Sequence, residues 1–184
     1  MILEIVKYGV PVLRQKGKAV DEITEDIQKL AANMIETMRV ANGVGLAAQQ
    51  VGVPLQLTVL EVESSEDRPS TMTIDGREAN LADWMPMVLL NPVLELSKEK
   101  EEGNEGCLSF PEITAEIERS SRVKTKGRLL DGREIEFEAT GLLARALQHE
   151  ADHLNGILFI DRMRSATRTA LAGRLKRLQR EVNA

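Results

Sequence analysis

The only two histidines of this chain stand four residues apart, in the stretch Gln148-His149-Glu150-Ala151-Asp152-His153. If this stretch is helical, both imidazoles lie on one face and can bind a single metal ion. Glu150 follows the first histidine and can lean over the open side of that ion, where a carboxylate handles the proton of a bound water. The pattern predicts a metallohydrolase, and a hydrogen-bonded pair of core histidines is the structural alternative.

A catalytic site of this kind has three protein ligands and an open fourth position. Metalloproteases that extend the motif place a third histidine where this chain has Phe159. The third ligand is therefore an Asp or Glu elsewhere, or the only cysteine, Cys107. Cys107 stands between Gly106 and Pro111, so we expect it outside the interior of a regular strand. Taken alone, a single free cysteine is more typical of a small buried apolar residue.

The segment Gly43-Val44-Gly45-Leu46-Ala47-Ala48-Gln49-Gln50 is the third candidate for chemistry. It loosely matches a dinucleotide fingerprint, but that fingerprint follows a strand and opens a helix, and here a helical pattern precedes it. We therefore predict no dinucleotide. The small residues either cap the helix and pack closely, or they allow a substrate backbone to approach while the Gln50 amide points at a reacting oxygen.

The elements that position these residues follow from hydrophobic spacing and turn signals. Helical spacing covers 23–39, with Asp21 or Thr24 as cap and Asn42-Gly43 as its end. A second helix is predicted over 142–154 and a third from Ser165. Strands are predicted at 55–59, 87–90, 112–118, 123–130 and 135–139. We expect Pro92 to mark an edge or the end of the second strand, 63–84 to form a surface loop or hairpin, and 97–105 to form a charged turn. This order favours an α+β domain.

Length and composition limit the classes of protein. The 184 residues suffice for one domain, predicted over 1–184, and the 42% hydrophobic and 29% charged residues are typical of globular proteins. No run of 18 apolar residues and no secretory signal is present, so no membrane association is expected. A single cysteine makes no internal disulfide, which favours a reducing cytoplasm.

Charge is unevenly distributed. The net charge of −5 argues against a dedicated nucleic-acid-binding protein, yet residues 162–184 carry seven Lys or Arg and one Glu. This C-terminal segment, 165–184 as a basic helix, is either a solvated helix face or a docking helix for a polyanion such as ribosomal RNA.

Taken together, the three segments resemble the peptide deformylases, which share the motifs GxGxAAxQ, EGCLS and QHExDH in this order. All three stand here unbroken, at Gly43–Gln50, Glu105–Ser109 and Gln148–His153. The resemblance covers essentially the whole chain. It implies an α+β fold with antiparallel strands packed around a central metal-binding helix, followed by a C-terminal helix.

The resemblance also implies an activity and its residues. The activity would be metal-dependent removal of the formyl group from N-formyl-methionyl peptides, with release of formate. Cys107, His149 and His153 would bind one divalent ion, usually Fe²⁺, with Zn²⁺, Ni²⁺ or Co²⁺ as substitutes. Glu150 would be the general base and acid, and the Gln50 amide and the Leu108 N–H would form an oxyanion hole. The substrate-binding residues would be Val44, Gly45, Leu142 and Ala146.

Some positions stay open. Relatives have an arginine seven residues after the metal cysteine, where this chain has Thr114. Arg145 is expected either at the mouth of the methionine pocket or pointing away from it, and Glu105 is expected to hold Arg119 or another cation. Two alternative functions remain at this point: a HExxH metalloprotease with a carboxylate third ligand, and a non-catalytic metal-containing module that docks on the ribosome.

Overall fold

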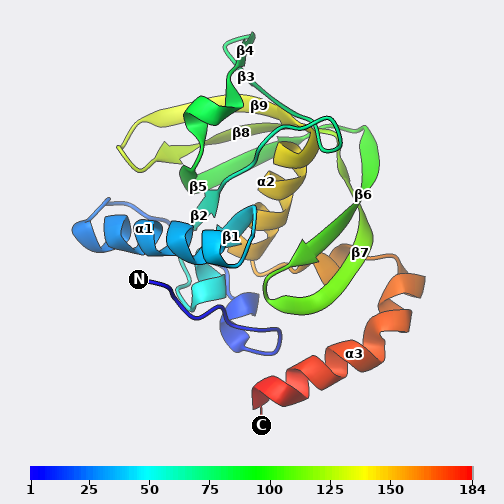
Figure 1. The fold of residues 1–184 in the computed structure, drawn as a ribbon. Coiled ribbons are helices and arrows are strands. Elements are labelled where there is room, and N and C mark those ends of the chain that lie inside the picture. The colour runs from blue at the N-terminus through cyan, green and yellow to red at the C-terminus, as the bar shows by residue number, and fades with distance from the viewer. Residues whose placement is uncertain (184) are drawn as a thin grey trace.

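The computed structural model describes residues 1–183, in which two antiparallel sheets surround one central helix, α2 (Figure 1). The larger sheet has seven strands in the order β1-β2-β5-β8-β9-β3-β4, and the smaller one pairs β6 with β7. The larger sheet contains β1 (Gly45–Ala47), β2 (Leu57–Leu60), β3 (Ser70–Ile74), β4 (Arg77–Ala79), β5 (Met87–Leu96), β8 (Arg122–Leu129) and β9 (Glu134–Thr140). The smaller sheet contains β6 (Lys100–Cys107) and β7 (Phe110–Ser120). The helices are α1 (Glu25–Val40), α2 (Gly141–Leu154) and α3 (Ser165–Asn183), with 3₁₀ turns at Pro11–Arg14, Ala48–Val51 (η2), Leu81–Trp84 and Phe159–Arg162 (η4). The α+β fold expected from the sequence is confirmed.

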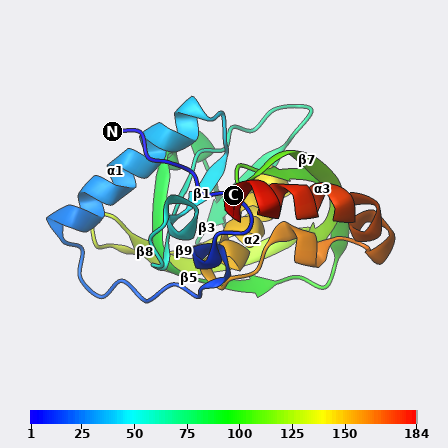
Figure 2. The ribbon, with the colours of Figure 1, turned by 90° about the horizontal axis from the view of Figure 1, so that it is seen from below.

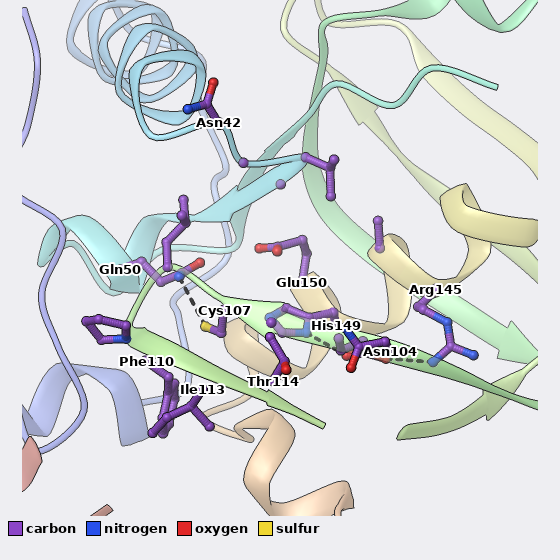
Figure 3. A pocket seen from close by; sticks show the side chains of 18 of the residues that line it. Asn42, Gln50, Asn104, Cys107, Phe110, Ile113, Thr114, Arg145, His149 and Glu150 are labelled. Atoms are coloured by element: carbon purple, nitrogen blue, oxygen red, sulfur yellow. Dashed lines mark hydrogen bonds and ion pairs between the residues drawn. The ribbon is translucent and has the colours of Figure 1, made fainter. Parts of the chain in front are cut away.

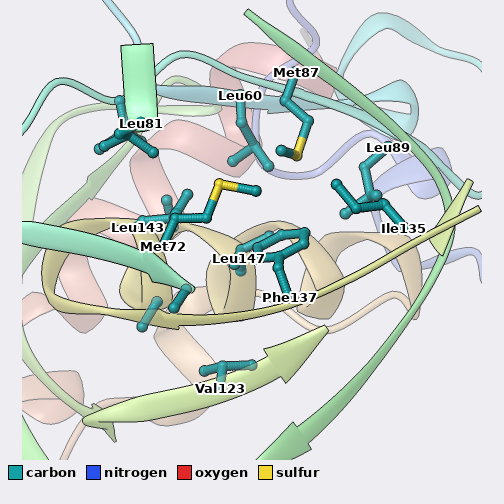
Figure 4. Close-up of a cluster of buried hydrophobic side chains, with 14 residues drawn as sticks. Leu60, Met72, Leu81, Met87, Leu89, Val123, Ile135, Phe137, Leu143 and Leu147 are labelled. Atoms are coloured by element: carbon teal, nitrogen blue, oxygen red, sulfur yellow. The ribbon is translucent and has the colours of Figure 1, made fainter. Parts of the chain in front are cut away.

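Helix α2 is the centre of the molecule. Every residue from Leu143 to Glu150 is buried, which is unusual for a helix of a small domain. One side packs on the large sheet, where Leu143 and Leu147 meet Met72 and Phe137 in a continuous cluster (Figure 4). Burial of each such side chain contributes about 1.5–3 kcal/mol to stability. The polar side of the helix is consequently held rigidly toward β6 and β7.

Helix α1 covers the β1–β2 end of the large sheet (Figure 1). The Thr24 side chain caps it by accepting a hydrogen bond from the Ile27 N–H at 3.2 Å. It ends at Val40, and Asn42 then takes a positive φ of 58° that reverses the chain into β1. The predicted helix and its end at Asn42-Gly43 thus agree with the structure to within a few residues.

Helix α3 lies on the outside, away from α1, as the view from below shows (Figure 2). Leu175 is buried, and Leu171 and Leu178 pack with it on a cluster around Phe110 and Phe159. The apolar side of this helix therefore faces the protein, and its basic side chains are exposed. No helix within residues 1–183 combines the length and apolarity needed to cross a bilayer.

One prediction about local structure was wrong. Segment 97–105 is mostly strand β6 rather than a turn, because its backbone pairs with β7 from Lys100 to Gly106; most of its charged side chains face solvent, but Glu105 is buried. Pro92 does not end β5 but lies on an edge: β5 continues to Leu96 through a bulge between Leu90 and Val93, and beyond Leu90 its only partner strand within residues 1–183 is β8. Segment 63–84 contains the β3–β4 hairpin, which turns at Asp75-Gly76 with positive φ at both residues.

Candidate metal centre

The three chemical motifs of the sequence meet at one place. The Cys107 sulfur and a ring nitrogen from each of His149 and His153 all lie within 4.8 Å of one another. The Cys107 Sγ to His153 Nε2 distance is 3.3 Å. Among residues 1–183 this is the group able to bind a metal, and it contains no carboxylate. The open question of the third ligand is therefore answered in favour of the thiolate.

Local structure explains how a residue 42 positions before the first histidine reaches it. The two histidines lie one turn apart on α2, with ring centroids 5.0 Å apart. Cys107 pairs with Phe110 at the tip of the β6–β7 hairpin, where the register shifts after Gly106. The hairpin tip therefore points its sulfur at the polar side of α2 (Figure 3).

Glu105 connects His149 to two buried arginines. Its carboxylate lies 2.8 Å from His149 Nδ1, accepts two hydrogen bonds of 2.9 Å from Arg119, and accepts one of 2.8 Å from Arg145. Arg119 also donates to Asp152 at 2.7 Å. Because Nδ1 is engaged by the carboxylate, His149 presents Nε2 to the metal position.

The contacts within this cluster also shift the pKa values of Glu105 and of the two histidines. Burial disfavours a charged Glu105, but hydrogen bonds from His149 and Arg119 outweigh it and hold its pKa far below the usual range. Burial likewise opposes a charged His149, but hydrogen bonds to Cys107 and Glu105 raise its pKa to about 10. Burial, and then the charge of His149, lower the pKa of His153 well below its usual value. His153 is therefore neutral without a metal, whereas His149 has to release its proton when a metal binds, because a ligating imidazole is neutral.

Glu150 lies beside the ligands without being one of them. Its side chain extends under β1, next to the cluster (Figure 3), and its carboxylate receives a 3.5 Å hydrogen bond from the Thr58 hydroxyl. Burial raises its pKa to about 7. A carboxyl group with this pKa can both accept and return a proton near neutral pH.

Gln50 is held with its amide directed at Cys107. Its Oε1 accepts a hydrogen bond from the Ala47 N–H at 3.0 Å, which fixes the orientation of the amide. Its Nε2 lies 3.2 Å from the Ser109 hydroxyl and 3.6 Å from the Cys107 sulfur. Leu108, the next residue after Cys107, lines the same pocket. Thr58 and Ser109 were not singled out from the sequence, although Ser109 belongs to the EGCLS segment.

A pocket of about 500 Å³ opens over this cluster. All four residues proposed for substrate binding line it: Val44, Gly45, Leu142 and Ala146. Thr114 lines it as well. So does Arg145, but its guanidinium is buried against Glu105 and the Ile117 carbonyl rather than free at the mouth. Arg68, from the segment 63–84 predicted as a surface loop or hairpin, also lines the pocket.

The donor set fits a divalent transition-metal ion. One thiolate and two imidazoles leave a fourth position open, as in catalytic sites, and such soft and borderline donors suit zinc and iron rather than magnesium or calcium. The Glu105–His149 pair supplies the carboxylate partner that metal-binding histidines usually have. The buried Nδ1 of His153 has no hydrogen-bond partner within residues 1–183, so this ring is held by packing and by the contact of its Nε2 with Cys107.

Comparisons with known proteins agree with this site. The family model of polypeptide deformylase matches residues 2–169. A peptide deformylase of Methylacidiphilum infernorum is 45% identical over 98% of this chain and 94% of its own length. The crystal structure of peptide deformylase from Thermotoga maritima superposes with a TM-score of 0.75 at 40% identity, covering 89% of this chain and 99% of that one.

A further structure extends the match. Peptide deformylase from Ehrlichia chaffeensis, solved in complex with actinonin, has a TM-score of 0.80 at 33% identity, with 96% of each chain covered. The family match extends over the metal cluster, Gln50 and the pocket. The chain therefore belongs to the polypeptide deformylase family.

Proposed function

We propose that Cys107, His149 and His153 hold one divalent ion, Fe²⁺ in the native protein, with which this chain performs the reaction of its family. That reaction removes the formyl group from N-terminal formylmethionine. The observation that carries the assignment is the convergence of one sulfur and two ring nitrogens beside Glu150 and Gln50. We also propose the cytoplasm as its location, because a reducing compartment keeps a lone thiolate ligand intact.

The residues divide the chemistry among them. When bound, the ion supplies the Lewis acidity that makes water a nucleophile near neutral pH. Glu150 takes the proton of the attacking water and returns it to the departing amine. The Gln50 amide and the Leu108 N–H donate to the carbonyl oxygen as it gains negative charge, each worth about 3 kcal/mol in comparable enzymes. The products are formate and a free N-terminal amine.

Substrate binding uses the edge of β1. This strand ends the large sheet, so one of its edges has no partner strand within residues 1–183 and faces the pocket. A peptide can extend along this edge past Gly45, with its methionine side chain toward Leu142 and Ala146.

Metal analysis tests the ligand set. Anaerobically purified protein should contain a single iron per chain and release formate from formyl-Met-Ala-Ser. Cys107→Ser should lose that ion or bind a different one, because a neutral hydroxyl replaces the thiolate. A Cys107→Ser protein with unchanged metal content and identity would place the third ligand elsewhere, as the metalloprotease alternative requires.

Gly45 gives a second prediction. A Cβ at this position would lie 2.8 Å from Glu150 Oε1 and 2.9 Å from its Cγ. Gly45→Ala should displace the carboxylate and lower kcat by about 10²-fold, the cost of an ångström-scale misplacement. The same change at Gly106, where the nearest atom is 3.4 Å away, is the control and should cost much less. Equal losses in both variants would argue against the displacement.

We further propose that α3 docks on the ribosome through its last turns. Four of the seven basic side chains bind within the chain: Arg162 to Asp152, Arg164 to Glu102, Arg168 to Asp161, and Arg174 to the Glu112 carbonyl. Lys176, Arg177 and Arg180 are exposed and have no such partner within residues 1–183. These three residues are the cations that a polyanion would meet.

Charge reversal of these three residues should weaken ribosome binding by about 10-fold or more at low salt, with a smaller difference at high salt. The measurement is co-sedimentation of the full-length chain with ribosomes. The control reverses Lys98, Lys124 and Lys126, which changes net charge equally but elsewhere on the surface. Equal binding by the two triple variants would refute a docking role for α3.

A further inference from the structure

We propose that Arg68 makes this chain prefer peptides with an acidic side chain at the third residue, two positions after the formylated methionine. The inference rests on the proposed function and deepens it, because it assigns a subsite to the segment between β2 and β3. Arg68 lines the same pocket as Leu142 and Ala146 although it lies far from the three chemical motifs in sequence.

The segment that carries Arg68 is pinned to the start of α2. A tight turn joins Ser65 and Arg68, whose backbone N–H donates to the Ser65 hydroxyl at 3.1 Å and whose carbonyl accepts from the Ser65 N–H at 3.2 Å. The next residue, Pro69, accepts from the Leu142 N–H at 3.1 Å. Gly141 allows this approach, since a Cβ there would lie 1.9 Å from the Pro69 oxygen. The backbone that carries Arg68 is thus held beside Leu142.

Three cationic residues line the pocket, and within residues 1–183 Arg68 is the one whose charged group has no partner in the protein. Lys7 donates to the Leu108 carbonyl at 3.2 Å, and Arg145 is buried against Glu105. The Arg68 guanidinium is exposed and forms no hydrogen bond or ion pair within residues 1–183. An anionic group of the substrate would therefore not have to displace an internal partner.

The sheet register indicates which part of a peptide reaches Arg68. Strand β1 runs from Gly45 to Ala47 and leads directly into η2, which carries Gln50, so the formyl end lies at the end of β1. The peptide then leaves past the start of β1. There the Glu61 N–H donates to the Val44 carbonyl at 2.9 Å, and the segment leading to Arg68 departs at this point.

Alternation along an extended peptide selects the third residue. Successive side chains point to opposite sides, so the third residue points to the same side as the methionine, about 7 Å further along. The methionine side is the side of Leu142, which the Arg68 segment touches through Pro69. A carboxylate at the third residue is therefore within reach of a long arginine side chain, whereas the second residue points away.

Paired substrates test this inference on the metal-loaded full-length chain. We expect kcat/KM for formyl-Met-Ala-Glu-amide to exceed that for formyl-Met-Ala-Gln-amide by about 2–5-fold at low salt, as for an exposed ion pair. The ratio should approach one at high salt. Arg68→Gln should abolish the preference and Arg68→Lys should keep most of it. Because each ratio is taken within one variant, general loss of activity cancels.

Two controls make the result specific. Arg133→Gln, in the β8–β9 turn, should keep the wild-type ratio. The pair with Glu or Gln at the second residue should give a ratio near one in wild type and in Arg68→Gln alike. A wild-type ratio of one at the third residue, or a preference that survives Arg68→Gln, would overturn the inference while deformylation remains intact. Absence of formate release from every substrate would instead contradict the proposed function.

Discussion

Replacement of Glu150 by Gln is expected to lower kcat for formate release by about 10²–10⁴-fold, the range for loss of a general acid–base group. The amide is nearly isosteric but neither accepts the proton of the attacking water nor delivers one to the leaving amine. Glu150 is not part of the ligand group, so metal content should stay unchanged. Steady-state formate release and metal analysis on the same sample measure both quantities.

The control for this prediction is Glu112→Gln. Glu112 lines the same pocket but is exposed, and within residues 1–183 its side chain has no partner, whereas its backbone carbonyl accepts a hydrogen bond from Arg174. Its replacement should change kcat by no more than a few fold. Formate release by Glu150→Gln within a few fold of wild type, at equal metal content, would move the proton-transfer role to another group.

The residue pattern alone predicts the two histidine ligands of the metal centre, but it does not predict the cysteine ligand. The spacing of His149 and His153 is a local property of a helix, so it predicts a shared ligand face without knowledge of the fold. Cys107 reaches them only because β6 and β7 form a hairpin whose tip meets α2. The residues of β6 gave no strand signal, because Lys and Glu dominate this strand and its stability comes from backbone pairing with β7. The EGCLS motif and the family resemblance supplied that ligand instead.

Buried ionic partners were predictable only in outline. Glu105 was expected to hold Arg119 or another cation, but charge alone does not show that Arg145 and His149 share the same carboxylate. Arg145 lies four residues before His149 on α2, which places it on the ligand side. Whether it faces solvent or Glu105 depends on where β6 crosses the helix. The role of Arg68 likewise depends on the contact between Pro69 and α2.

Glu105→Gln is expected to lower the free energy of unfolding by about 3–5 kcal/mol, because removing one partner of a buried ionic group leaves its partners uncompensated. Arg119 and Arg145 are only 4% and 8% exposed, so neither guanidinium can regain full hydration. Glutamine also presents NH₂ where Glu105 now offers an oxygen to an N–H donor. Urea unfolding of metal-free protein measures the stability, and chelator competition should show metal affinity reduced by about 10–100-fold, since His149 loses its orienting carboxylate.

Glu102→Gln is the matched control, since it makes the same change on the same strand three residues away. Glu102 pairs with Arg164, but both side chains are exposed, at 41% and 70%, and such surface pairs contribute about 0–1 kcal/mol. A much larger loss of unfolding free energy for Glu105→Gln than for Glu102→Gln would show that the contribution of Glu105 to stability depends on its burial rather than on the number of its ion pairs. A loss below about 1 kcal/mol for Glu105→Gln would mean that Asp152, which also binds Arg119, suffices to compensate the buried guanidinium. In that case Glu105 would be retained mainly to orient His149, and the metal affinity would fall without a matching loss of stability.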